Sequence, residues 1–212
     1  MRPAFGSDID DTAIISHHVT EKFWEYLIEE GITHNREVYA KTHDWNAAIP
    51  DRNPDELYSH FVTSGRAPPI KEMPGARDAL GKIALTHDVH FVTTRNPQSL
   101  DHIRPDLMRL FEPINIAGYW PCAGQPKTPV IKRLGIRYFV DDNIEVLSHL
   151  RNIPGLTLIQ FPSWHNGKTP YVDNENMKRL PACDSVEEGV LSVEEICLLA
   201  WEQLLKIVNR KL

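Results

Sequence analysis

Short hydrophobic runs alternate with amphipathic segments along most of the chain. Residues 88–93 and 156–161 are rich in β-branched and aromatic side chains, which is typical of buried strands. Between such runs, apolar residues recur every three or four positions, as on one face of a helix. This alternation predicts an α/β fold, a three-layer Rossmann-like core with a parallel sheet between helices and the functional site at the carboxyl ends of the strands.

The individual elements follow from the same periodicity. After a first strand that leads to Asp8, the predicted strands are residues 88–93, 114–117, 138–142 and 156–161. The predicted helices are residues 14–32, 76–85, 100–111, 129–134, 144–150 and 193–208. Residues 162–184, rich in Pro, Asn, Gly and Lys, are expected to form a long loop.

About sixty residues separate the first two predicted strands, and they contain short helical patterns interrupted by prolines. We therefore expect a small helical cap at residues 14–73, inserted after the first strand of a core formed by residues 1–13 and 74–212. Three aromatic residues of this segment either stack on a substrate ring or form the core of the cap itself: Trp45, Tyr58 and Phe61.

Composition narrows the class of protein. The chain has 212 residues, of which 42% are hydrophobic, and a formal net charge of -6. An acidic chain of this kind argues against a partner such as a nucleic-acid polymer, whereas a small phosphorylated metabolite fits. The sequence contains no run of about twenty apolar residues of the kind that spans a membrane. Its three cysteines are too few and too scattered for a disulfide framework, so we expect a cytoplasmic location.

An aspartate cluster follows the first strand in the sequence Phe5-Gly6-Ser7-Asp8-Ile9-Asp10-Asp11-Thr12. Alternation along a strand sends Asp8 and Asp10 to the same side, where two carboxylates repel each other unless a cation lies between them. Mg²⁺ favours such oxygen ligands. The alternative is a helix N-cap; an EF-hand loop is excluded by Ala13 and Val19 at its sixth and twelfth positions.

The carboxyl ends of further strands carry polar residues that would meet the aspartates at one edge of the sheet. Four motifs in order, Asp8-Ile9-Asp10-Asp11-Thr12, Phe91-Val92-Thr93, Lys127 and Phe139-Val140-Asp141-Asp142, resemble those of the haloacid dehalogenase-like (HAD) superfamily. The resemblance spans most of the chain. It also extends to the Met73-Pro74-Gly75-Ala76 entry to the next helix.

This resemblance implies four catalytic residues. Asp8 would be the nucleophile that forms an aspartyl-phosphate, and Asp10 the general acid and base for the leaving group and the water. Thr93 would bind the transferring phosphoryl group, and Lys127 would neutralise its charge. Lys132 is the alternative lysine, but we favour Lys127 because the family's lysine opens the helix in which Lys132 lies.

The resemblance also implies a Mg²⁺ site formed by Asp8, Asp10, Asp142 and Asp141. Asp142 would bind the metal directly, and Asp141 would lie behind it or bind through water; the reverse order is also open. Three residues just beyond the second strand are candidate substrate-binding residues at the mouth of the cleft: Thr94, Arg95 and Asn96.

The implied function is a Mg²⁺-dependent phosphatase acting on a small phosphomonoester. The cap position resembles the 5'(3')-deoxyribonucleotidase-like branch, so a nucleoside monophosphate is the first substrate to consider. The chain departs from that branch at Asp11-Thr12, where Gly-Val is usual. The alternatives are a phosphotransferase or phosphomutase and a non-catalytic protein that binds a phosphorylated ligand. The oligomeric state is left open, with a dimer among the options.

Overall fold

The computed structural model describes residues 2–42, 45–162, 176–182 and 192–209. Its centre is a six-stranded sheet in which every neighbouring pair of strands is parallel. The order across the sheet is β5-β4-β1-β6-β7-β8. These strands are β1 (Ala4–Ser7), β4 (Asp88–Thr93), β5 (Ile116–Pro121), β6 (Ile136–Asp141), β7 (Thr157–Gln160) and β8 (Met177–Arg179).

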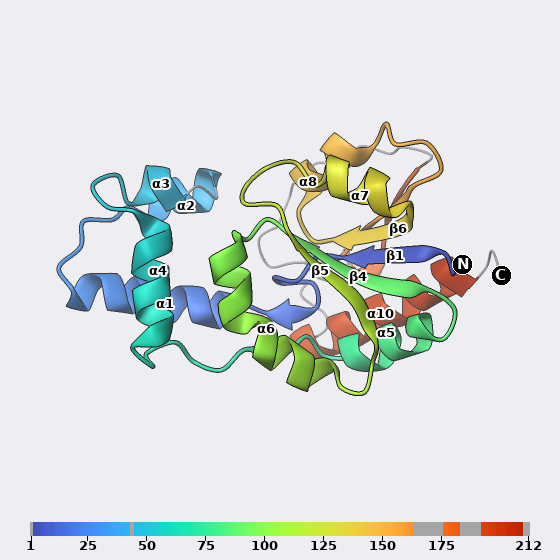
Figure 1. Ribbon diagram of the computed structural model, residues 1–212, viewed down its shortest axis with the longest axis horizontal. Coiled ribbons are helices and arrows are strands. Elements are labelled where there is room, and N and C mark those ends of the chain that lie inside the picture. The colour runs from blue at the N-terminus through green and yellow to red at the C-terminus, as the bar shows by residue number, and fades with distance from the viewer. Residues whose placement is uncertain (1, 43–44, 163–175, 183–191, 210–212) are drawn as a thin grey trace.

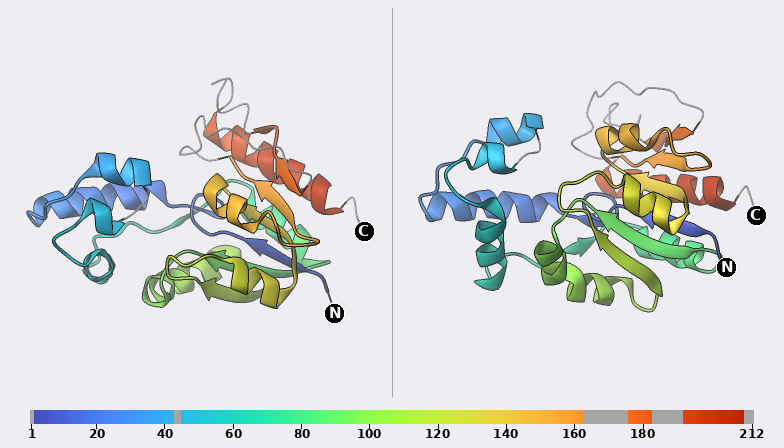
Figure 2. Two further views of the ribbon diagram at one scale, coloured as in Figure 1. Left: turned by 90° about the horizontal axis from the view of Figure 1, so that it is seen from above. Right: turned by 45° about the horizontal axis from the view of Figure 1, so that its top comes forward.

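Helices cover both faces of the sheet (Figure 1, Figure 2). One face packs against α5 (Ala76–Ala84), α6 (Pro97–Phe111) and α10 (Val193–Asn209), and the other against α7 (Thr128–Leu134) and α8 (Ile144–Leu150). Each face of the sheet has its own hydrophobic core. Successive residues of one strand contribute to different cores, because their side chains point to opposite faces. The three-layer α/β fold predicted from the periodicity is therefore confirmed. Among the helices in the described ranges, none combines the length and apolar character needed to cross a bilayer.

The segment between β1 and β4 leaves the sheet and forms a helical group beyond the carboxyl ends of the strands (Figure 1). A short antiparallel pair, β2 with β3, lies where the segment leaves and rejoins the sheet. Its elements are β2 (Ile14–Ile15), α1 (His17–Glu29), α2 (Arg36–Thr42), α3 (Trp45–Ala48), α4 (Pro54–Thr63) and β3 (Lys71–Glu72).

Aromatic side chains form the interior of this helical group. The Phe23 ring lies 5.1 Å from Trp45, 5.4 Å from Tyr58 and 5.3 Å from Phe61, measured between ring centroids. The three aromatic residues singled out in the sequence thus all pack against Phe23 inside the helical group. Of the two alternatives for them, the structure favours the role in the core.

Three predicted elements differ from the structure. The strand expected at residues 114–117 lies instead at Ile116–Pro121. The helix expected at residues 14–32 is shorter, because residues 14–15 pair with β3 before α1 begins. Part of the loop expected at residues 162–184 is the edge strand β8, whose Met177 is buried against β7. Three residues are too few to show an alternating pattern, which explains why the sequence did not reveal this strand. Residues 163–175 and 183–184 of that prediction lie outside the described residues.

Candidate functional site

A buried lysine connects the first and fourth strands of the sheet at their carboxyl ends. Lys127 Nζ lies 2.6 Å from Asp8 Oδ1 and 2.8 Å from Asp141 Oδ2. Asp8 follows β1 directly, Asp141 ends β6, and Lys127 immediately precedes α7. Because β1 and β6 are neighbours, their carboxyl ends meet at one edge and bring together residues that are far apart in sequence. Lys132, the alternative lysine, is exposed on α7.

Three carboxylates converge beside this lysine. One oxygen atom from each of Asp8, Asp141 and Asp142 lies within 4.8 Å of the others. Asp141 is held at both oxygens, since its Oδ1 accepts from the Asn143 backbone N–H at 2.8 Å and its Oδ2 accepts from Lys127. Asp142 is partly exposed and accepts from the Thr12 hydroxyl at 3.4 Å. Three hard oxygen ligands in one place fit a divalent cation such as Mg²⁺.

The charges of this cluster act on one another strongly. Burial raises the pKa of Asp8 from 3.8 to about 7; Lys127 opposes this increase, whereas Asp141 and Asp10 add to it. Burial would lower the pKa of Lys127, but Asp141 and Asp8 raise it, so the ammonium stays charged. The metal-free cluster thus holds more negative charge than one lysine neutralises, which favours binding of a cation.

Asp10 lies apart from this carboxylate cluster and is paired with an arginine. Arg95 Nη2 donates to Asp10 Oδ1 at 2.7 Å, and Arg95 Nε donates to Asp10 Oδ2 at 2.8 Å. The chain has left β1 at Ser7, so strand alternation no longer fixes the direction of the Asp10 side chain. Burial would lower the pKa of Arg95, but Asp10 raises it, and the guanidinium is charged at any working pH. The pair is bidentate, the strong form of an arginine–carboxylate contact.

The other predicted site residues occupy the end of β4. Thr93 is fully buried there, and its hydroxyl accepts from the Arg95 backbone N–H at 3.2 Å. Thr94 is exposed, and its carbonyl accepts from the Gly124 N–H at 2.8 Å. The Asn96 side chain caps α6 by accepting from Ser99 N at 2.7 Å, a structural contact that the sequence did not suggest.

Asp11 stabilises the start of α1. Its Oδ1 accepts from the backbone N–H groups of Ser16 at 2.9 Å and His17 at 3.3 Å. Ser16 is the N-cap residue but makes no side-chain cap of its own. Asp11 itself has a φ of 50°, a left-handed conformation in which aspartate is among the better tolerated non-glycine residues. These contacts give Asp11 a structural role, in which its side chain bonds backbone amides where the chain enters α1.

Two residues that contact Arg95 were not assigned to the site from the sequence. Ser99 Oγ accepts from Arg95 Nη1 at 3.0 Å, and the Tyr58 hydroxyl lies 3.4 Å from the same nitrogen. Tyr58 belongs to the inserted helices, and no local pattern could show that it reaches Arg95 at the edge of the sheet.

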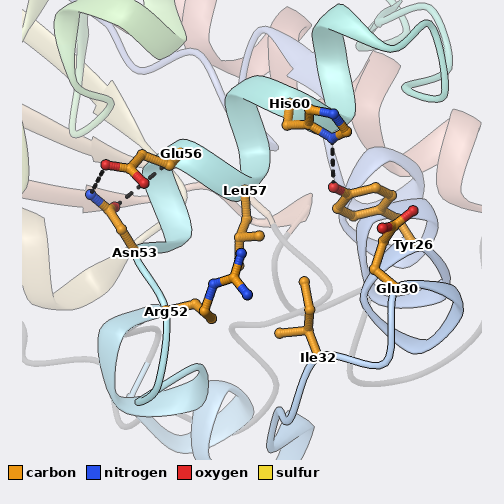
Figure 3. A pocket seen from close by; sticks show the side chains of 8 residues that line it. All are labelled: Tyr26, Glu30, Ile32, Arg52, Asn53, Glu56, Leu57 and His60. Carbon is orange, nitrogen blue, oxygen red and sulfur yellow. Dashed lines mark hydrogen bonds between the residues drawn. The ribbon is translucent and has the colours of Figure 1, made fainter.

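A separate hollow of about 340 Å³ lies within the inserted helices (Figure 3). The Tyr26 hydroxyl and His60 Nδ1 form a hydrogen bond of 2.8 Å on one side, and Arg52 points into the hollow over Leu57. None of the site residues predicted from the sequence lines it. The carboxylate cluster, where charges and candidate nucleophile meet, is the better candidate for chemistry.

Comparisons with known proteins identify the fold. No protein-family model matches the sequence, and no curated protein matches it by sequence. Among solved structures, CbbY from Rhodobacter sphaeroides in complex with phosphate has a TM-score of 0.59 at 16% identity, covering 84% of this chain and 94% of that one. A CbbY mutant in complex with xylulose-(1,5)bisphosphate gives 0.60 at 17% identity, with the same shares covered.

A third structure agrees with these two. A HAD-superfamily hydrolase of subfamily IA from Geobacter sulfurreducens PCA has a TM-score of 0.50 at 15% identity, covering 90% of this chain and 97% of that one. At such low identity, the likeness identifies the fold alone. The HAD resemblance inferred from the four motifs is confirmed at the level of the fold.

Proposed function

We propose that this chain, which has the HAD fold, is a Mg²⁺-dependent phosphatase of small phosphomonoesters. The observation that carries the proposal is the ion-paired group Asp8–Lys127–Asp141 beside Asp142 at the carboxyl ends of β1 and β6. Two solved structures with this fold were determined with phosphate or a sugar bisphosphate, which supports a phosphorylated ligand. We further assign residues 14–73 as a cap on a core of residues 1–13 and 74–212.

The residues present fit a magnesium ion. Asp8, Asp141 and Asp142 would hold it, together with backbone or water oxygens near Asp10, and the ion would supply positive charge to a phosphoryl group. We assign direct binding of the ion to Asp142, which is partly exposed, rather than to Asp141, whose two oxygens accept from Lys127 and from the Asn143 backbone N–H.

We assign to Asp8 the attack on phosphorus. Its Oδ1 is held by Lys127, and within the described part of the chain its Oδ2 forms no hydrogen bond. In the proposed reaction this carboxylate forms a bond to phosphorus as the bond to the leaving oxygen breaks. Lys127 offsets the negative charge of both groups, and the Thr93 hydroxyl donates to a phosphoryl oxygen.

Asp10 completes the proposed reaction as acid and base. It gives a proton to the leaving oxygen in the first step. In the second step it removes a proton from the water that attacks the aspartyl-phosphate and releases Asp8. In the structure both of its oxygens accept from Arg95, so separation from Arg95 would leave the carboxyl free for both steps.

Hydrolysis of p-nitrophenyl phosphate tests the proposal. We expect turnover with Mg²⁺, loss of turnover with EDTA, and a decrease of at least about 1,000-fold for Asp8→Asn, because the nucleophile is removed. Asp51→Asn, a change at an exposed aspartate, serves as the matched control and should retain wild-type turnover. Equal turnover by Asp8→Asn and wild type would contradict the mechanism.

The same assay separates the alternative functions. A broad panel of phosphate esters, including nucleoside monophosphates, sugar phosphates and amino-acid phosphates, should contain good substrates. A rise in product without a matching rise in free phosphate on adding acceptor alcohols would identify a phosphotransferase. Ligand-dependent thermal shifts without turnover of any ester would identify a binding protein.

A further inference from the structure

Arg95 holds the proposed acid and base in a bidentate ion pair. Its guanidinium engages both oxygens of Asp10, at 2.7 and 2.8 Å, and its third nitrogen contacts Ser99 and Tyr58. The side chain of Arg95 is only 14% exposed. While this pair stands, both oxygens of Asp10 already accept from Arg95, and each keeps only its remaining lone pair for other partners. A substrate group that took the place of Asp10 on Arg95 would release both oxygens.

We propose that Arg95 recognises a second anionic group of the substrate, a carboxylate or a second phosphate, and that binding of this group releases Asp10 for catalysis. This inference rests on the proposed phosphatase function and names the substrate class of the same site. Arg95 is then the residue that determines specificity, and the empty enzyme keeps its acid and base engaged until a suitable substrate binds.

The replacing group must be an anion for an energetic reason. Moving a mostly buried guanidinium away from a carboxylate leaves a charge without a partner, which costs more than a neutral hydroxyl can return. A carboxylate or phosphate presents two oxygens in the spacing that Arg95 already uses on Asp10. A nucleoside monophosphate has no anion besides the phosphate to be cleaved, so it belongs among the poorer substrates.

The surroundings of Arg95 also suit an anion. Ser99 lies in the first turn of α6, a turn without acidic side chains, where the helix dipole is positive. The Ser99 and Tyr58 hydroxyls both lie within 3.4 Å of Arg95 Nη1, and each can rotate its proton toward an incoming oxygen. Tyr58 comes from α4, so the inserted helices and the sheet edge each contribute to this subsite.

Matched ester pairs test the proposal. Carboxyalkyl phosphates with one to four methylene groups are each compared with the alkyl phosphate of equal length, with kcat and KM measured at saturating Mg²⁺. At the best length, the wild type should prefer the carboxylate by about 10- to 100-fold in kcat/KM. This range corresponds to the free energy that hydrogen bonds to a charged group contribute. Arg95→Leu should lose this preference mainly through KM and should raise kcat on the plain alkyl phosphate, because Asp10 is released.

Two further variants control the test. Arg109→Leu, a change at an exposed arginine of the same helix α6, should behave as wild type. Arg95→Lys keeps the charge without the bidentate geometry and should retain part of the preference. That result would exclude a folding defect as the cause of the lost preference in Arg95→Leu. A wild type without preference at any length, an Arg95→Leu variant that keeps the preference, or equal losses on both esters would overturn the proposal.

Failure of the phosphatase function is distinguishable from failure of this inference. If the wild type hydrolyses no ester, the corresponding non-hydrolysable phosphonates, with and without the carboxylate, are titrated by calorimetry in the presence of Mg²⁺. Tighter binding of the carboxylate form that disappears in Arg95→Leu would uphold recognition by Arg95. Equal binding of the two forms by the wild type would reject it.

Discussion

At the scale of single residues, one buried lysine ammonium contacts two carboxylates at the centre of the site. Lys127 contacts both Asp8 and Asp141, and its ammonium also lies 5.2 Å from the centre of the Phe139 ring. Asp142 adds a third carboxylate. Since like charges in a buried site destabilise each other, the metal-free cluster carries a cost that the fold must offset elsewhere.

The pKa of Asp8 predicts how this cost depends on pH. Burial raises it from 3.8 to about 7, so the folded chain binds this proton more tightly than the unfolded chain does. The stability that protonated Asp8 contributes is complete below pH 3.8 and is lost as the pH rises through about 7. Asp8→Asn removes the ionisation. We expect the metal-free variant to gain stability over wild type from pH 4 upward, with a plateau above pH 7.

Urea unfolding in EDTA at a series of pH values measures this effect. The difference in free energy of unfolding between Asp8→Asn and wild type should grow with pH and then level off. Asp51→Asn, at an exposed position, should show no such trend. A variant that is less stable than wild type at pH 8 would contradict the prediction.

At the scale of elements, the close approach of β1 and β6 depends on a glycine. A Cβ atom added to Gly6 would lie 2.7 Å from Phe139 Cδ2 and 2.9 Å from Ile136 Cδ1. Gly6 and Phe139 are register partners in neighbouring strands. The glycine that interrupts the apolar run before Asp8 thus makes room for the Phe139 ring, over which Lys127 lies.

Two glycine-to-alanine changes should therefore have opposite effects. Gly6→Ala overpacks the space beside Phe139 and should lower the free energy of unfolding by about 1–3 kcal/mol. Gly81→Ala lies within α5, where the new methyl would meet Ile114 Cδ1 at an ordinary 3.7 Å. It should raise stability by up to about 1 kcal/mol through helix propensity. Chemical denaturation of both variants checks the pair, and a stabilising Gly6→Ala would refute the packing argument.

At the scale of the whole molecule, metal binding and folding are coupled. The cluster joins two strand ends of the sheet, so it exists only in the folded chain, and an ion that binds there stabilises the fold. At about 100 times its dissociation constant, Mg²⁺ contributes about 2.7 kcal/mol, which raises Tm by roughly 5–10 °C for a chain of this size.

Thermal melting with Mg²⁺ and with EDTA measures this coupling without any substrate. Asp142→Asn should lose most of the increase in Tm, because a ligand is removed without disturbing the Lys127 ion pairs. Asp51→Asn should keep the full increase. An equal Mg²⁺-dependent shift in all three proteins would place the ion elsewhere.

The sequence by itself determined the order and type of most elements. Strands such as residues 88–93 and helices such as residues 144–150 follow from hydrophobic periodicity, which is a local property. It also determined which polar residues follow strand ends, because parallel strands collect those ends at one edge. The choice of Lys127 over Lys132 came from the HAD resemblance, in which the lysine opens the helix, and in the structure Lys127 contacts Asp8.

Only the tertiary structure decided which side chains meet. Arg95 and Asp10 are 85 positions apart in the chain, and Lys127 and Asp8 are 119 positions apart. Periodicity carries no information on such contacts, which depend on where the chain turns after β1 and on how the inserted helices pack. For the same reason the sequence placed Asp10 with Asp8 on one side of a strand, whereas the strand ends at Ser7 and the Asp10 carboxylate pairs with Arg95.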